Sequence, residues 1–281
     1  MPKQKIEVVS KEGLRLSAIH YTAIPKNSEM IIISGATGVK KEFYTDYAEF
    51  LFENGFDVIM YDYRGTGESA TKLSTDANHR MHEWGELDME TIISWGKNQY
   101  DKLHLTCHSI GGQVFPFTNS HHEISSAIFI ASQNLYHGHW SGFERVKVLL
   151  FWYIILPALV GIFGYLPYWV LGGGSNLPKN IALDWKMYGT NKHGIIMDKP
   201  QRRKAYQSVK SKIKFISLDD DHTLAPKCAV YQLVMDYGRS PEEHWHIVPS
   251  DYQLDYIGHF GFFRPKVGRA KLWNEVLAHY Q

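Results

Sequence analysis

Cysteine is scarce in this sequence, and so is any excess of charge. The two cysteines, Cys107 and Cys228, are too few for a disulfide framework, which favours a reduced, cytoplasmic protein. Thirty Lys and Arg face 29 Asp and Glu with no basic cluster, so the electrostatic signature of a nucleic-acid binder is missing. The first 21 residues lack the apolar core of a secretory signal. Internal repeats are also absent, which excludes solenoid and propeller architectures.

One long segment has no charge at all. From Val148 to Pro178 the chain runs for 31 uncharged residues, long enough to span a membrane. However, the segment is interrupted repeatedly, by Pro157, Gly161, Gly164, Pro167 and the Gly172–Gly174 run, and sequence of alternating strand and helix patterns lies on both sides of it. We therefore expect a pair of short helices that form a buried cap or lid, and we do not expect a membrane partner.

The remaining sequence predicts an α/β fold. Apolar residues make up 44% of the chain and aromatics 14%, which is ample for a large core. Short apolar runs alternate with longer amphipathic ones, the pattern of a mostly parallel sheet flanked by helices. The expected strands are 6–10, 14–21, 30–34, 58–61, 103–107, 126–132, 213–218 and 245–248. The expected helices are 44–52, 84–95, 111–118, 227–237 and 266–280.

The alternation of strands and helices stops after Ser132 and returns near 213. Between about 136 and 205 the chain carries aromatics, glycines and prolines without strand–helix units. We therefore predict one catalytic core in two parts, residues 1–135 and 206–281, with a helical cap inserted at 136–205.

The strongest local signal is a serine between an expected strand and an expected helix. In Leu105–Gly112 (LTCHSIGG), Ser109 stands at the turn with small residues on both sides. A nucleophile elbow needs this arrangement because its turn is so tight that neighbours two positions away must be small. Gly111 fits the usual Gly-x-Ser-x-Gly pattern, whereas Cys107 takes the place of the first glycine. Ser109 is thus the predicted nucleophile.

An acid and a base follow in the order expected of such a site. Three carboxylates, Asp219, Asp220 and Asp221, follow an apolar strand, and one of them could orient a histidine. Asp221 is the favoured acid, Asp220 is the alternative, and Asp219 is expected at the surface. His259, between Gly258 and Phe260, is the predicted base. The order Ser, Asp, His along the chain is that of α/β-hydrolases and differs from the orders in chymotrypsin and subtilisin.

Two further stretches agree with this interpretation. Ser34–Gly38 (SGATG) follows an expected strand where an oxyanion-hole amide is placed in such enzymes, so the backbone N–H groups of Ala36 and Ile110 are candidate oxyanion donors. Tyr61–Ser69 (YDYRGTGES) follows the next strand, and its glycines indicate a structural turn near the mouth of the site.

Together these motifs resemble the α/β-hydrolase superfamily over the whole chain outside the cap. The cap stretch GYLPYWVLGGGSNLP and the stretch IGHFGFFRP resemble bacterial hydrolases of the serine aminopeptidase-like (S33-type) branch. The resemblance implies an α/β-hydrolase fold and a metal-free Ser–His–Asp hydrolase that needs no cofactor. It does not fix the substrate, because one scaffold serves esterases, thioesterases, lipases, peptidases and amidases.

The cap is the only part that bears on the substrate. Its aromatic side chains, with Trp152, Tyr165 and Trp169 as the chosen substrate-binding residues, suit an apolar acyl or aromatic ester, a small-molecule partner. An aminopeptidase or amidase is the alternative, and it would need an acidic group such as Asp184 or Glu144 to hold an amine. A non-catalytic binding module on the same fold would need a degraded triad. A zinc site at a His-x-His pair lacks a third ligand at a recognisable spacing.

Overall fold

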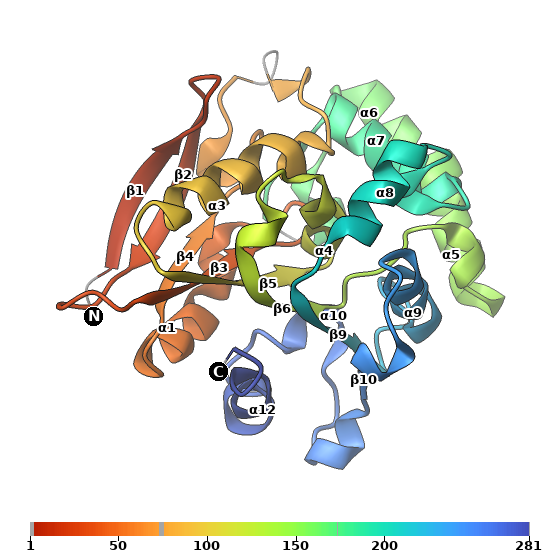
Figure 1. Ribbon diagram of the computed structural model, residues 1–281. Helices are drawn as coiled ribbons and strands as arrows, with labels where there is room; N and C mark the ends of the chain where they lie inside the picture. The colour runs from red at the N-terminus through yellow and green to blue at the C-terminus, as the bar shows by residue number, and fades with distance from the viewer. Residues whose placement is uncertain (1–2, 73–75, 173, 281) are drawn as a thin grey trace.

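An eight-stranded sheet forms the centre of the molecule. The computed structural model describes residues 3–72, 76–172 and 174–280. The strands lie in the order β1-β2-β4-β3-β5-β6-β9-β10 (Figure 1). Only the β1–β2 and β2–β4 pairs are antiparallel in this sheet, which confirms the predicted α/β class. The strand bounds are β1 Lys3–Val9, β2 Arg15–Tyr21, β3 Glu29–Ser34, β4 Asp57–Tyr61, β5 Lys102–His108, β6 Ile124–Ile130, β9 Lys212–Leu218 and β10 His244–Ile247.

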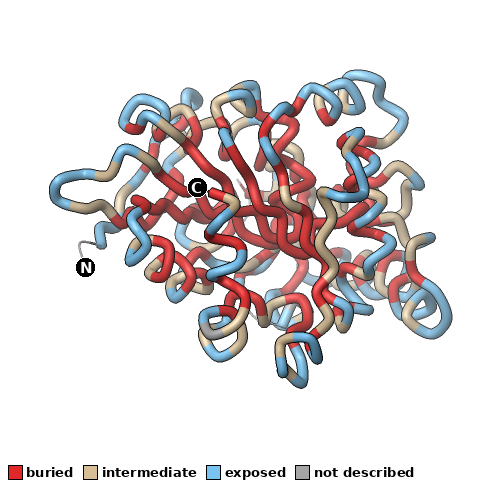
Figure 2. The backbone as a smooth tube through the Cα atoms, turned by 60° about the horizontal axis from the view of Figure 1, so that its bottom comes forward, coloured by how far each residue is buried: buried red, intermediate tan, exposed pale blue. Residues whose placement is uncertain are grey.

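Helices cover both faces of this sheet. In β3, Met30 and Ile32 belong to one apolar cluster, whereas Ile31 and Ile33 belong to another. Successive side chains of a strand point to opposite faces, so each cluster lies on one face. The central strands are consequently buried along most of their length (Figure 2). The helices of the core are α1 Thr45–Glu53, α3 Glu90–Lys97, α4 Ile110–Val114, α9 Lys227–Asp236, α10 Gly258–Gly261, α11 Gly268–Lys271 and α12 Trp273–Leu277.

The expected strands and helices correspond to observed elements, with three differences in the helices. The helix expected at 84–95 begins as a π-helical stretch, Trp84–Met89, and continues as α3. The helix expected at 111–118 ends as a 3₁₀ turn at Phe115–Phe117. The C-terminal helix expected at 266–280 is divided into α11 and α12. In the last two places short helical pieces pack against the sheet, and packing instead of helix propensity sets their ends.

The cap differs from the expectation more strongly. It contains α5 Gly142–Leu150, α6 Leu156–Phe163, α7 Lys179–Thr190 and α8 Pro200–Ser208, with the short strands β7 Tyr165–Leu166 and β8 Leu177–Pro178. A π-helical stretch, Phe151–Ile155, joins α5 to α6, so one helix runs for 22 residues from Gly142 to Phe163. The expected breaks at Pro157 and Gly161 were therefore wrong, whereas the expected break at Gly164 is observed.

Pro157 is tolerated because of where it stands. It occupies the first turn of α6, directly after the π-helical stretch. Proline lacks an N–H, and a π-type turn already alters the hydrogen-bond ladder at that point. The helix ends at Gly164 instead, which adopts the left-handed conformation with φ of +75°. By length and composition this helix could cross a membrane, and 22% of its most apolar window is buried.

An ion pair between a half-exposed arginine and a buried aspartate attaches the cap to the core. Asp184 of α7 accepts bonds from Arg80 Nε at 2.8 Å and Arg80 Nη2 at 2.5 Å. The same carboxylate also accepts a bond from the Met81 amide at 3.0 Å, and it is almost fully buried. A two-pronged Arg–carboxylate contact fixes orientation as well as distance, so this contact sets the position of α7 on the core.

We expect Asp184→Asn to weaken this attachment. Hydrogen bonds to charged groups contribute roughly 1.5–3 kcal/mol each, so the free energy of unfolding should fall by about 2 kcal/mol or more. Urea denaturation followed by circular dichroism measures this change. Asp198→Asn is the matched control in the cap, because the Asp198 side chain is 75% exposed and pairs with His193. Equal stability of the two variants would contradict the assignment.

Candidate active site

Ser109 lies at a sharp turn between β5 and α4. Its backbone is strained, with φ of +54° and ψ of −113°, a conformation that L-residues rarely adopt. The turn is held by a bond from the Ser109 amide to the Ile130 carbonyl at 3.0 Å. A Cβ at Gly111 would lie 2.8 Å from the Ser34 carbonyl oxygen, and one at Gly112 would lie 2.6 Å from Ser132 Oγ. The small residues predicted from the motif are thus required by space.

Cys107 fits where the motif usually has glycine. Its side chain is fully buried, and a Cβ at Gly111 would be 3.2 Å from Cys107 Cβ. The glycine at 111 therefore leaves the room that the cysteine uses. Burial raises the pKa of the Cys107 thiol well above its ordinary value, so the thiol stays protonated and unreactive.

Asp221 and His259 are brought together by the loops after β9 and before α10. The His259 ring Nδ1 lies 2.6 Å from Asp221 Oδ2, and both side chains are buried. Asp221 Oδ1 accepts a second bond from the Leu224 amide at 3.2 Å. A carboxylate at Nδ1 holds the ring in the tautomer whose Nε2 is free to accept a proton.

The neighbouring carboxylates have separate contacts. Asp220 accepts two backbone bonds, from the Ile257 amide at 2.6 Å and the Gly258 amide at 2.9 Å, so it holds the segment that carries His259. Asp219 is exposed, as expected, and contacts His246 Nε2 at 3.1 Å. Asp221, the favoured acid, is therefore the carboxylate on the imidazole, whereas the alternative, Asp220, contacts the loop backbone.

A chain of hydrogen bonds links this histidine segment to the loop after β3. His108 Nε2 lies 2.9 Å from the His259 carbonyl oxygen, which can only accept, so this nitrogen carries a proton. Burial, followed by the nearby His259, lowers the pKa of His108 well below its ordinary value. In the resulting neutral ring Nδ1 is an acceptor, and it accepts from Tyr44 Oη at 2.9 Å. Tyr44 Oη in turn accepts from the Ala36 amide at 2.8 Å.

The two candidate oxyanion amides therefore differ. Ile110 is the first residue of α4, so its amide has no carbonyl four residues back within the helix. The Ala36 amide already donates to Tyr44. Sequence reasoning missed Tyr44, His108 and Asp220 as supporting residues, although His108 directly precedes the serine and Asp220 stands in the carboxylate cluster.

The chain is similar to known hydrolases. A model of the family "Serine aminopeptidase, S33" matches residues 25–161, just under half of the chain. No curated protein gives a significant sequence match. Solved structures of the same fold include the esterase Pf2001 of Pyrococcus furiosus, at 15% identity and a TM-score of 0.59, covering 99% of this chain and 93% of that one. The chain therefore has the α/β-hydrolase fold, and its residues 25–161 are similar to the serine aminopeptidase (S33) family.

Two further structures show the same fold. Est1E of Butyrivibrio proteoclasticus, with bound ferulic acid, matches this chain at 13% identity and a TM-score of 0.63, covering 98% of both chains. Est816, an N-acyl homoserine lactone degrading enzyme, matches at 16% identity and a TM-score of 0.63, covering 98% of this chain and all of its own. These likenesses confirm the fold and leave the substrate open.

The three aromatic residues chosen in the cap are not equivalent. Trp152 is buried and packs edge-on against Trp185 at 5.0 Å between ring centroids. Tyr165 pairs with Pro178 in the small β7–β8 ribbon. Trp169 is 58% exposed. The structure does not bring the three side chains to one cavity, and their role in substrate selection stays a prediction.

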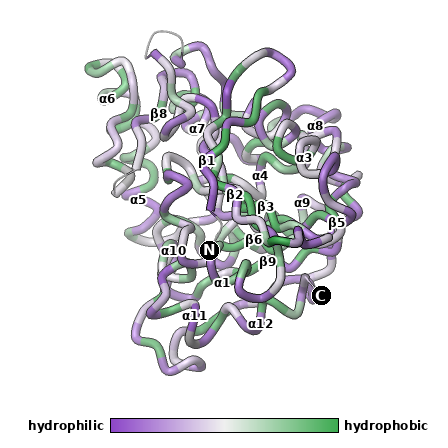
Figure 3. Tube along the Cα trace, turned by 90° about the vertical axis from the view of Figure 1, so that its left-hand side faces the viewer, coloured by the Kyte–Doolittle hydropathy of each residue, from purple (hydrophilic) through white to green (hydrophobic). Residues whose placement is uncertain are grey.

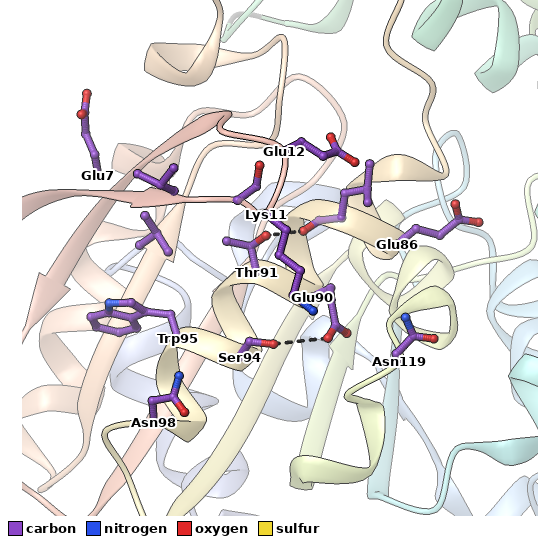
Figure 4. Close-up of a pocket in the computed structure, with 14 residues that line it drawn as sticks. Glu7, Lys11, Glu12, Glu86, Glu90, Thr91, Ser94, Trp95, Asn98 and Asn119 are labelled. Atoms are coloured by element: carbon purple, nitrogen blue, oxygen red, sulfur yellow. Dashed lines mark hydrogen bonds between the residues drawn. The ribbon is translucent and has the colours of Figure 1, made fainter.

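Two cavities lie away from Ser109. The larger one, about 530 Å³, lies between the turn after β4 and the cap, and its lining includes Gly65, Thr71, Tyr168 and Ser175. The other, about 420 Å³, lies between the β1–β2 hairpin and α3 (Figure 4). Acidic side chains, such as Glu12, Glu86 and Glu90, surround that second cavity. Neither cavity is lined by Ser109, Asp221 or His259.

A cluster of carboxylates beneath the turn after β4 is filled by a lysine. Among the described residues, Glu42, Asp62 and Glu68 lie close enough together to hold a metal ion. The buried Lys41 ammonium stands between them, at 2.9, 2.7 and 2.6 Å. These contacts offset part of the negative charge of the cluster. They also fix the turn, because Asp62 accepts a bond from the Glu68 amide. This agrees with the structural interpretation of Tyr61–Ser69.

We expect Asp221→Asn to lower kcat by about 10⁴, because the amide can stabilise the wrong histidine tautomer. Asp219→Asn is the matched control and should have little effect, since the Asp219 side chain is exposed and contacts His246. Asp220→Asn should give an intermediate loss by loosening the His259 segment. Steady-state kinetics on an activated ester measure all three. A larger loss in Asp220→Asn than in Asp221→Asn would exchange their roles.

Tyr44→Phe should lower the free energy of unfolding by about 1–3 kcal/mol, because it leaves the buried His108 Nδ1 without a donor. Tyr47→Phe is the control, since the buried Tyr47 hydroxyl has no hydrogen-bond partner among the described residues. Urea denaturation compares the two variants. If both are equally stable, the hydrogen-bond chain through Tyr44 contributes nothing to stability.

Proposed function

We propose that this chain is a metal-free serine hydrolase that acts through an acyl-enzyme, with Ser109 as nucleophile, His259 as base and Asp221 as the orienting acid. The observation that carries the proposal is the 2.6 Å contact of Asp221 with the His259 ring. The segment that carries His259 is joined to the strained Ser109 turn, because His108 donates a hydrogen bond to the His259 carbonyl. The rings of His108 and His259 are 4.8 Å apart between centroids, which keeps this segment beside the elbow.

The proposed reaction has two halves. Ser109 Oγ attacks the carbonyl carbon of the ester while His259 Nε2 takes the hydroxyl proton. The Ile110 amide, with Ala36 as second donor if it leaves Tyr44, stabilises the oxyanion of the tetrahedral intermediate. Collapse expels the alcohol, which receives the proton from His259. A water molecule then attacks the acyl-enzyme and gives a proton to His259. Collapse of this second intermediate releases the acid, and His259 returns the proton to Ser109 Oγ.

Carboxylic esters with apolar acyl or aromatic groups are the proposed substrates. The apolar character of the cap supports this choice, and so do the esterases among the similar structures. The contacts of the two cap carboxylates support it further. Asp184 is engaged by Arg80, and Glu144 is engaged by Lys147 and Thr223. Neither is free to hold the α-amine of a peptide.

Peptide or amide hydrolysis is the second candidate, and the match to the serine aminopeptidase model favours it. A panel of p-nitrophenyl esters of varied chain length beside aminoacyl p-nitroanilides separates the two candidates. Turnover of the anilides with kcat/KM above that of the esters would favour the peptidase. Turnover of neither class, together with no labelling by a fluorophosphonate probe, would favour a non-catalytic binding module.

Ser109→Ala should abolish ester turnover, with a loss on the order of 10⁶ in kcat, while the protein stays folded. Labelling by a fluorophosphonate should also disappear, because the probe reacts with the activated hydroxyl. Ser132→Ala is a matched control, since Ser132 is buried nearby and its hydroxyl has no hydrogen-bond partner among the described residues. Unchanged ester turnover in Ser109→Ala would refute the proposed nucleophile.

A further inference from the structure

The long helix of the cap, Gly142–Phe163, carries a second apolar face that has no partner. Its buried residues recur every fourth position and pack inward: Val148, Trp152, Leu156 and Val160. Large apolar side chains on the other side are exposed to solvent: Phe143, Val146, Leu150, Tyr153, Ile154, Ile155, Ile162 and Phe163. A surface helix of a globular protein normally has polar residues on that side. We call this set of exposed residues the outer face of the cap.

The outer face is extensive. A helix of 22 residues is ~33 Å long, and exposed apolar residues occur from its first turn to its last. Phe143 near one end is 74% exposed, Ile154 in the middle 59%, and Ile162 near the other end 75%. Tyr168 and Trp169, just beyond the helix, are also more than half exposed. Figure 1 shows α5 and α6 along the outer side of the cap, and Figure 3 shows apolar stretches along α6.

The cap has a positive net charge, which favours a negatively charged partner. Between residues 136 and 205 there are nine Lys and Arg against three Asp and Glu, a net charge of +6. The whole chain carries +1, so the rest of the chain carries −5. Arg145 and Lys147 are exposed on the first turns of the helix, beside Phe143 and Val146. Positive charge is therefore concentrated in the part of the chain that bears the outer face.

This combination favours a lipid surface over a protein partner. Protein interfaces need about one hydrogen bond per 100–200 Å², whereas the outer face offers only the Tyr153 hydroxyl among its side chains. A second copy of this chain would bring two caps of +6 together, which like-charge repulsion disfavours. Anionic lipids attract basic residues, and Trp and Tyr are enriched at the membrane–water interface.

We propose that the outer face of the cap is a docking surface for an anionic phospholipid bilayer, on which the helix lies in the plane of the interface. The helix does not span the bilayer in this proposal, because its inner stripe packs inside the cap, where Trp152 contacts Trp185. Its first turn is also held to the loop of the predicted acid, by Thr223 Oγ1 donating to Glu144 at 2.8 Å. The proposal departs from the expectation of no membrane partner, and it does not depend on the proposed hydrolysis.

The test is flotation of the full-length protein with vesicles of phosphatidylcholine alone or with ~30% phosphatidylserine. Wild-type protein should float with the anionic vesicles and much less with the neutral ones. Raising the salt concentration from ~0.05 to ~0.5 M should reduce binding, because it screens the charge. Absence of wild-type flotation with anionic vesicles would overturn the proposal. So would protein that stays with the vesicles after alkaline extraction, because that result indicates a spanning helix.

Two variants locate the surface. Ile154→Ser/Ile162→Ser removes two exposed apolar side chains and should lower the vesicle partition coefficient by at least ~10-fold. Tyr231→Ser/Met235→Ser is the matched control, because it removes two exposed apolar side chains from α9 in the core and should leave flotation unchanged. Equal loss in both double variants, or no loss in either, would overturn the assignment to the outer face.

A second double variant tests the same face by changing its charge, so that the test does not depend on the folding of Ile154→Ser/Ile162→Ser. Arg145→Glu/Lys147→Glu changes only exposed side chains, and it should remove most of the preference for anionic vesicles. Light scattering measures the oligomeric state of each protein in solution. It therefore tests the alternative that a second copy of this chain covers the outer face. A wild-type dimer that becomes monomeric in Ile154→Ser/Ile162→Ser, without flotation of the wild type, would assign the face to a second copy of this chain and overturn the bilayer.

Discussion

The arrangement of the site depends on two adjacent carboxylates that follow β9. Asp220 binds the backbone on which His259 is carried, and Asp221 binds the imidazole ring itself. One turn of chain thus fixes both the position of the loop and the orientation of the side chain. Because β9 is paired in parallel to β6, and β6 to β5, their carboxyl ends lie at the same edge of the sheet. The turn of Ser109 and the Asp221 turn are therefore neighbours in space, although more than a hundred residues separate them in sequence.

Around this centre, buried polar groups form contacts that fix loops. Lys41 is surrounded by carboxylates under the turn after β4, and Arg80 holds Asp184 of the cap. Neutral His108 connects the His259 carbonyl to Tyr44. Each of these groups would be costly to bury alone, and each is paired. The loops at this edge of the sheet are consequently held by directional bonds, whereas the strands beneath them are held by apolar packing.

The core strands and the sharp turn at Ser109 could be predicted from sequence because their signals are local. Alternation of apolar runs predicts strands, and a serine between small residues predicts a tight turn. The choice between Asp220 and Asp221 could not be settled, since both stand in the same turn and only the geometry of the His259 segment distinguishes them. Tyr44 and the Arg80–Asp184 pair were missed because their partners are 64 and 104 residues away in sequence. Long-range pairs of that kind leave no periodic pattern.

The cap shows why single residues are weak predictors of where a helix ends. Pro157 and Gly161 were expected to break the segment, yet the helix continues through both. The π-helical stretch before Pro157 changes the ladder at the point where proline has no donor, and the inner stripe of large side chains supplies packing that outweighs the cost of glycine. Continuity of the helix places exposed apolar residues along its whole length, with Arg145 and Lys147 on its first turns. Two short helices folded inward would have buried much of that surface. The unbroken helix thus explains how a chain of nearly neutral charge exposes a long row of apolar side chains in a segment whose own net charge is +6.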